Sequence, residues 1–244
     1  MTPHTMLAFD ADLRELASTV IEMADLTSKQ LSDAVDALIT GNTALAREVR
    51  AGDEAIDAMQ QAIEAKAIET IATRQPLAND LREIIGALRI ATDLERIGDL
   101  ASNIAKRADQ VVRQSFAREI SVHLRRMTQR ASAQLFSVIS SYRHRDTEAA
   151  IKVWMGDEDI DALHNATFRL LLTHMMEDPG NISLGMHLLF CAKNIERIGD
   201  HTTNIAETLY FLVHGKPLAQ IRPKRDRTVE APSPGDNGHQ EDVA

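Results

Sequence analysis

The five-residue block Glu-Arg-Ile-Gly-Asp occurs twice in this chain, at residues 95–99 and again, 101 residues later, at 196–200. Another repeated block precedes it, because Gly-Asp-Glu-Ala-Ile-Asp-Ala at 52–58 recurs as Gly-Asp-Glu-Asp-Ile-Asp-Ala at 156–162, with a spacing of 104. The spacing falls by three between the blocks, so the second copy is three residues shorter there. A period near 100 residues indicates a duplicated domain rather than an array of short repeats. The fold must therefore accommodate two copies of one unit.

Each unit has the pattern of three long helices. Apolar and small residues between 79 and 113 recur at steps of three and four, which is typical of a helix in a bundle. Gly41, Asn42 and Pro76 interrupt this pattern, and Asn79 is a good N-cap. We expect helices at about 9–39, 43–74 (bent at Gly52) and 79–113, and at about 116–141, 146–177 and 181–214.

These ranges predict an all-α fold of two tandem, pseudo-symmetric three-helix bundles made of long antiparallel helices. The first repeat should span residues 1–114 and the second 115–216. Proline and charged residues dominate the remainder, so we expect a disordered C-terminal tail at 217–244.

Composition narrows the class of protein. Hydrophobic residues make up 44% of the chain but aromatic residues only 4%, as in packed helices. A net charge of −9 argues against direct binding to nucleic acid and against general attraction to anionic lipid. No apolar run approaches the roughly 18 residues of a membrane span. The single cysteine, Cys191, allows no disulfide within the chain, so we expect a reducing, cytoplasmic location.

Acidic side chains recur at helical spacing in both copies. In each Glu-Arg-Ile-Gly-Asp block, two acids lie four residues apart and an asparagine follows four residues later, which places all three on one helix face. The repeated 52–58 block adds a further pair of acids at the same spacing. The candidate residues are Asp53, Asp57, Glu95, Asp99 and Asn103 in the first copy, and Asp157, Asp161, Glu196, Asp200 and Asn204 in the second.

If the acids of neighbouring helices face each other, four carboxylates meet in each bundle. Two like charges about 4 Å apart repel by about 4 kcal/mol at an effective dielectric of about 20, so such a cluster needs cations, protons or solvent. Oxygen ligands suit hard ions such as Mg²⁺, Ca²⁺ and Mn²⁺, and also iron. A helical wheel places the stripe that starts at Glu95 opposite the apolar stripe, so we expect the sites at the surface, outside the bundle cores.

Each block also carries a glycine in the middle of a helix, Gly98 or Gly199, which costs about 1 kcal/mol relative to alanine. Its presence in both copies indicates a close helix approach or space for a hydrated ion. The alternative is a solvated acidic face with local ion pairs to Arg96 and Arg197. We expect His201 to be a surface residue and Trp154 to be a packing residue.

The sequence contains no convincing nucleophile, no Glu-x-x-His pair and no phosphate-binding loop of the Walker type. The residues themselves thus give no sign of catalysis, and the family resemblance described below implies a protein that is not an enzyme. Two alternatives remain open at this stage. One is a carboxylate-bridged metal enzyme in a helical bundle, and the other is a metal-free helical scaffold.

The repeated blocks resemble those of the PhoU family of phosphate-signalling proteins, over about residues 9–215. The resemblance implies metal clusters, of iron, Mg, Mn or Zn, held by the ten candidate residues. It also implies a negative regulator of phosphate uptake and of the phosphate-starvation response. Such a regulator is an adaptor between the ATPase of a phosphate ABC transporter and a sensor histidine kinase. These partners would hold it at the inner face of the membrane. Long exposed helices also favour a homodimer.

Overall fold

The computed structural model describes residues 3–111 and 117–218, with side chains from Phe9 onward. This part of the chain is helical and contains no strand, so the predicted all-α class is confirmed. The helices are α1 (Pro3–Thr40), α2 (Thr43–Arg74), α3 (Asn79–Val111), α4 (Arg118–His144), α5 (Thr147–Met155), α6 (Glu158–Glu177), the short 3₁₀ helix η1 (Pro179–Asn181) and α7 (Ile182–His214).

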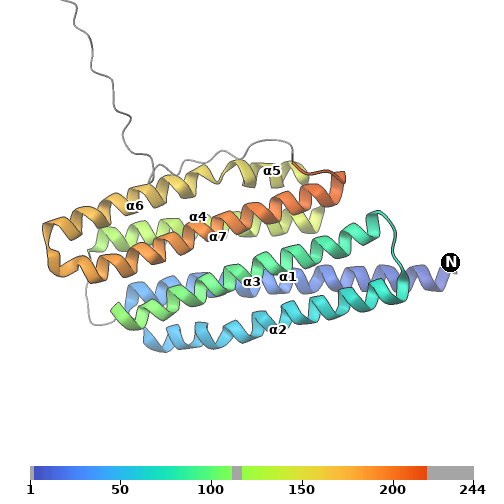
Figure 1. Cartoon of the computed structure of the whole chain (residues 1–244), viewed down its shortest axis with the longest axis horizontal. Helices are drawn as coiled ribbons and strands as arrows, with labels where there is room; N and C mark the ends of the chain where they lie inside the picture. The colour runs from blue at the N-terminus through green and yellow to red at the C-terminus, as the bar shows by residue number, and fades with distance from the viewer. Residues whose placement is uncertain (1–2, 112–116, 219–244) are drawn as a thin grey trace, which may run out of the picture.

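The helices form two bundles that lie side by side along their lengths (Figure 1). The first bundle contains α1, α2 and α3, and the second contains α4, α7 and the successive helices α5 and α6, which share one position. The predicted architecture of two three-helix bundles is therefore confirmed. The boundary predicted between 114 and 115 lies outside the described residues, as does the predicted tail beyond Leu218.

Local sequence signals set the helix ends. The Asn42 side chain accepts hydrogen bonds from two main-chain N–H groups at the start of α2, and Asp146 accepts one at the start of α5. Gly41, between α1 and α2, has φ 66°, a left-handed conformation that glycine adopts without strain. The apolar stripe of α3 is fully buried at Leu94 and Ile97, which confirms the wheel for the inward face of this helix.

The helix predicted over 146–177 is interrupted at Gly156 and Asp157, which is a correction. Gln134 of α4 donates from Nε2 to the Gly156 carbonyl oxygen at 2.7 Å, so this carbonyl bonds to a side chain outside its own helix. The matching Gln30 lies 3.4 Å from a main-chain oxygen of α2. α2 runs without interruption through Gly52, where we expected a bend. The stronger glutamine contact thus accompanies the break in the second copy.

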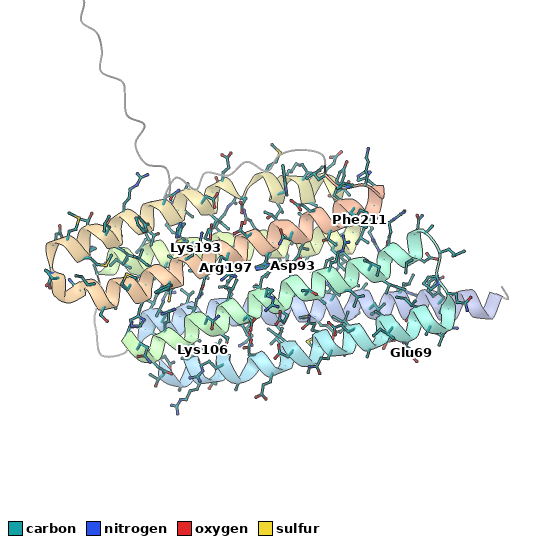
Figure 2. The ribbon with its side chains drawn as sticks, viewed as in Figure 1. Glu69, Asp93, Lys106, Lys193, Arg197 and Phe211 are labelled. Atoms are coloured by element: carbon teal, nitrogen blue, oxygen red, sulfur yellow. The ribbon has the colours of Figure 1, made fainter. Side chains whose placement is uncertain are left out.

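The two bundles pack mainly through α3 against α7 and α1 against α4. Asp93 lies at the seam between α3 and α7 (Figure 2), where its Oδ1 is 2.9 Å from Nδ1 of His201. The Arg107 guanidinium also lies over the Phe190 ring, 4.3 Å from the ring centroid. His201 is therefore a partly buried contact between the bundles and not the surface residue that we expected. Within the described residues, no helix combines the length and apolar character needed to cross a membrane.

Candidate functional site

The first carboxylate cluster lies between α2 and α3. Gly98 allows the two helices to pack closely here, because a Cβ at this position would lie 2.9 Å from Ile56 Cδ1 and 3.6 Å from Asp53 Oδ1. Asp53 accepts a hydrogen bond from Ser102, one turn further along α3. The structure therefore brings α2 and α3 close together at the repeated block, which is one of the two explanations that we considered for the mid-helix glycine.

The acids of the two helices act on one another across this contact. Burial raises the pKa of Asp53, and the charges of Asp99 and Asp57 raise it further, against the Ser102 hydrogen bond. Burial also raises the pKa of Glu95, with added effects from Asp99, Asp57 and Asp53. The pKa of Asp53 in α2 and that of Glu95 in α3 are thus each raised by acids of the facing helix. From the sequence alone, this proximity was only a hypothesis.

The second cluster repeats this geometry between α6 and α7. A Cβ at Gly199 would lie 2.9 Å from Ile160 Cδ1 and 3.5 Å from Asp157 Oδ1. The corresponding distances at Gly98 are 2.9 Å and 3.6 Å, so the duplicated blocks form the same contact twice.

The second cluster is more deeply buried than the wheel predicted, and its expected surface position was wrong. Asp157, Asp161 and Glu196 are 2%, 5% and 6% exposed. A physical reason lies next to the cluster, where the fully buried Trp154 occupies the position that the exposed Arg50 has in the first copy. The second site is therefore closed where the first is open, and Trp154 is the packing residue that we predicted.

A lysine in α7 offsets part of the charge of the second cluster. Lys193 Nζ lies 2.8 Å from Glu196 Oε2. Burial raises the pKa of Glu196, the Lys193 contact opposes that shift, and the charges of Asp200 and Asp161 add to it. No counterpart of Lys193 exists in the first copy, because the aligned residue is Thr92.

Sequence reasoning missed several polar residues of these sites. Ser102 left no signal, since a serine at helical spacing is common, and Lys193 is absent from the first copy. His164 and Asn165 follow Asp161 on the buried face of α6, at 6% and 8% exposure. The spacing Asp161-Ala-Leu-His164 is a signal for this histidine, because Asp-x-x-His, like Glu-x-x-His, places both side chains on one face of a helix.

The two asparagines of the predicted set make other contacts. Asn103 is exposed and accepts a hydrogen bond from Lys106 Nζ at 3.2 Å. The Asn204 side-chain amide donates to Asp93 Oδ1 at 3.3 Å and thereby joins the two bundles. The side chain of Asp99 is 44% exposed, and its Oδ2 lies 3.2 Å from Arg96 Nη1. This is the local ion pair that the alternative interpretation predicted.

The chemistry of both clusters fits a cation, although their side chains are not yet arranged around one. Glu95 Oε2 and Glu196 Oε2 are buried and accept no well-aligned hydrogen bond from the described residues, even though Arg96 Nε lies 3.4 Å from the former and Lys193 Nζ 2.8 Å from the latter. The donors are oxygens, and the glycines let the acid-bearing helices approach closely, with Ile56 and Ile160 packed where a Cβ would lie. Among the described residues, no three His, Cys, Asp or Glu side chains form a group that could hold a metal ion as they stand. Ligation would therefore require rotation of side chains.

Comparison with known proteins agrees with this duplicated architecture. The PhoU domain model matches the chain twice, at residues 20–108 and 124–209. The phosphate-specific transport system accessory protein PhoU homolog of Rhizobium meliloti (strain 1021) is 48% identical over 225 residues, covering 92% of this chain and 95% of that protein. The homolog of the same name from Caulobacter vibrioides (strain NA1000 / CB15N) is 43% identical over 226 residues, covering 93% and 98%.

Solved structures show the same fold. The crystal structure of PhoU from Pseudomonas aeruginosa has a TM-score of 0.81 and 36% identity, and the match covers 85% of this chain and all of that one. The crystal structure of the phosphate transport system regulatory protein PhoU from Streptococcus pneumoniae has a TM-score of 0.80 at 28% identity, covering 87% of this chain and all of that one. With a domain model matched in both halves and relatives matched over nearly their full length, this chain belongs to the PhoU family.

Proposed function

We propose that this protein is an accessory protein of phosphate transport, which acts by contacting other proteins and not by catalysis. The observation that carries the proposal is the 48% identity to a phosphate-specific transport system accessory protein, over almost the whole of both chains. The bundles add long helical surfaces on which partners could dock. In its finer form, the protein represses phosphate uptake and the starvation response when phosphate is plentiful.

The proposed partners are the ATPase of a phosphate ABC transporter and a sensor histidine kinase, contacted from the cytoplasm at the inner face of the membrane. The protein would act there as a homodimer. Deletion of the gene should raise phosphate uptake and the expression of starvation genes in cells grown at high phosphate, and the intact gene should restore repression. Uptake and expression that stay at the repressed level after deletion would contradict the regulatory proposal.

We further propose that the carboxylate clusters bind metal ions, of magnesium, manganese, iron or zinc. A bound cation would supply positive charge between the two helices of each cluster. The pKa values of Asp53, Glu95 and Glu196 are raised, and Asp157 is buried with Glu196, so the charged carboxylates are unfavourable there without a cation. The carboxylates would hold the ion and thereby fix α2 to α3 and α6 to α7.

Metal analysis of the purified protein tests this part of the proposal. Asp99→Ala combined with Asp200→Ala should lower bound metal, because together the two changes remove one acid from each cluster. The exposed Glu54, next to Asp53 but on the outer side of α2, provides the control Glu54→Gln. Equal and negligible metal in the unchanged protein and in the double variant would leave a metal-free scaffold as the better description.

A further inference from the structure

A basic hollow opens to solvent beside the first carboxylate cluster. It has a volume of about 480 Å³, and Arg47, Arg50 and Lys106 line it together with Asp53 and Ser102. All three basic side chains are exposed, so their charged ends are accessible from solvent. Figure 2 shows Lys106 on the side of α3 that faces α2. Metal binding by the carboxylates gives these three cations no role.

The existing contacts leave most of the donors of this hollow available. Arg50 Nη1 bonds to Asp109 Oδ2 at 3.3 Å, and Arg47 Nε bonds to a main-chain oxygen of its own helix at 3.2 Å. Lys106 Nζ bonds to Asn103 Oδ1 at 3.2 Å. Within the described part of the chain, each group thus uses one N–H in a hydrogen bond, whereas a guanidinium offers five donors and an ammonium three.

The second bundle closes the equivalent position. Where the first copy has its three basic residues, the aligned residues of the second are Ile151, Trp154 and Glu207. Trp154 is 2% exposed, and its Nε1 donates to Glu207 Oε1 at 2.8 Å. The second copy therefore packs at this place with none of these three basic side chains. Because the shared fold does not need the three basic side chains, their convergence in the first copy calls for another explanation.

We propose that the hollow binds an oxyanion of the phosphate class, held by Arg47, Arg50 and Lys106. Planar guanidinium groups bind two oxygens of a tetrahedral anion at once, and an ammonium group adds a compact charge. Inorganic phosphate is the candidate that agrees with the names of the relatives.

The carboxylates at the edge of the hollow connect this site to the proposed metal, and in this respect the inference rests on the proposed function. Asp53 lines the hollow and also belongs to the first cluster. Without a cation its charge repels an anion, and with one that repulsion is removed. Coupling between two ligands is reciprocal, so phosphate should strengthen cation binding by the same factor by which the cation strengthens phosphate binding.

Calorimetric titration of inorganic phosphate into the full-length protein, with and without saturating Mg²⁺, tests the proposal. Binding of Mg²⁺ alone is measured first. The test variant is Arg50→Gln combined with Lys106→Gln. The matched control, Lys29→Gln combined with Arg125→Gln, removes the same charge from two exposed residues outside the hollow, which pair with Asp33 and Asp36. Circular dichroism during heating shows that both variants keep the fold.

We expect the test variant to bind phosphate roughly tenfold or more weakly than the unchanged protein, while the control and Mg²⁺ binding change little. No binding of phosphate to the unchanged protein at millimolar concentration, or an equal loss in both variants, would overturn the site. Equal phosphate affinity with and without Mg²⁺ would overturn the pairing of anion and cation. Each of these results leaves the gene-deletion test untouched, so the two proposals can fail separately.

Discussion

Gly98 and Gly199 have the same role in their two bundles, and this role explains why a residue that weakens a helix is present in both. Each allows an isoleucine from the facing helix to pack against the helix backbone, and each leaves an aspartate oxygen within 4 Å of the position that a Cβ would take. The glycine therefore sets the distance between the two acid-bearing helices.

Substitution of this glycine tests the close packing. Gly98→Ala should gain about 1 kcal/mol of helix propensity but lose about 1–3 kcal/mol through overpacking against Ile56, because the added Cβ would lie 2.9 Å from Cδ1 of a fully buried side chain. We expect a net loss of about 1 kcal/mol in the free energy of unfolding, measured in urea.

A second substitution, Ile56→Val, removes the Cδ1 methyl group that a Cβ at position 98 would meet. By itself it should lower the free energy of unfolding by about 0.5–1.5 kcal/mol. In the double variant Gly98→Ala, Ile56→Val, the two costs should not add, since the space left by one change receives the methyl group of the other. Additive losses would show that the contact at Gly98 is not the source of the destabilisation.

The raised pKa of Glu95 makes the stability of the metal-free protein depend on pH. The native carboxyl keeps its proton above the ordinary pKa of 4.5, so the native state binds more protons than the unfolded state in the window that begins there. The contribution is therefore fully present below pH 4.5 and is lost as the pH rises through the native pKa. Stability should fall across this window on the way to neutral pH.

Glu95→Gln should remove this contribution to the pH dependence. Compared with the unchanged metal-free protein, the variant should gain in relative stability as the pH rises from about 4.5 to 7 in urea-unfolding series. The exposed Glu54→Gln is the control and should follow the unchanged protein. If the free energies of unfolding of Glu95→Gln and of the unchanged protein instead differ by the same amount at every pH, that result would show that the raised pKa of Glu95 does not contribute to stability.

The sequence identified most acids of the sites but few of the residues that distinguish the two. Asp53 and Asp157 could be found because a repeat compares equal positions, and in the structure each lies near the glycine of the facing helix. Lys193 and the Trp154–Glu207 contact could not be found in this way, because they occur in one copy only. Burial of the second cluster depends on these unmatched side chains, so a repeat-based argument could not predict it.

At the scale of elements, the helix ends were predictable and the break in the second copy was not. Helix ends depend on local signals such as Asn42 and Gly41, which act through the nearest main-chain groups. The break at Gly156 depends on Gln134, which comes from another helix. Each copy has a glycine and a glutamine at these positions, so the residue types alone do not predict the break. The length of the glutamine hydrogen bond differs between the continuous α2 and the pair α5 and α6.

The two glutamines give a test of that difference. Gln134→Met removes a 2.7 Å hydrogen bond to the Gly156 carbonyl and should lower the free energy of unfolding by about 1 kcal/mol. Gln30→Met should cost less, because the hydrogen bond that it removes is long at 3.4 Å. Urea unfolding of both variants would measure the order, and a larger loss for Gln30→Met would contradict this explanation.

At the scale of the whole molecule, the contact between the bundles uses residues most of which differ between the two copies, although Asn204 matches Asn103. Asp93 of α3 contacts His201 and Asn204 of α7, and Arg107 stacks on Phe190. The pattern within each repeat predicts how three helices pack together, but it contains no information about a surface that exists only between the repeats. The side-by-side arrangement was therefore outside the reach of the sequence argument.

Gly86 of α3 and Leu212 of α7 lie in close contact, and they allow the last test. A Cβ on Gly86 would lie within 2.7 Å of Leu212 Cγ, and Leu212 is 4% exposed. Gly86→Ala should therefore lower the free energy of unfolding by about 1–3 kcal/mol through overpacking. Leu212→Ala should lower it by about 2–5 kcal/mol, because it leaves a cavity at the seam.

The double variant Gly86→Ala, Leu212→Ala should be more stable than the sum of the two losses predicts. The truncated leucine no longer meets the new methyl group, and this methyl group fills part of the cavity that Leu212→Ala leaves. A double-mutant cycle in urea should therefore give a coupling of at least about 1 kcal/mol. Because these residues belong to different bundles, such a coupling would show that the contact between the bundles stabilises the fold, whereas additive losses would contradict the close contact at Gly86.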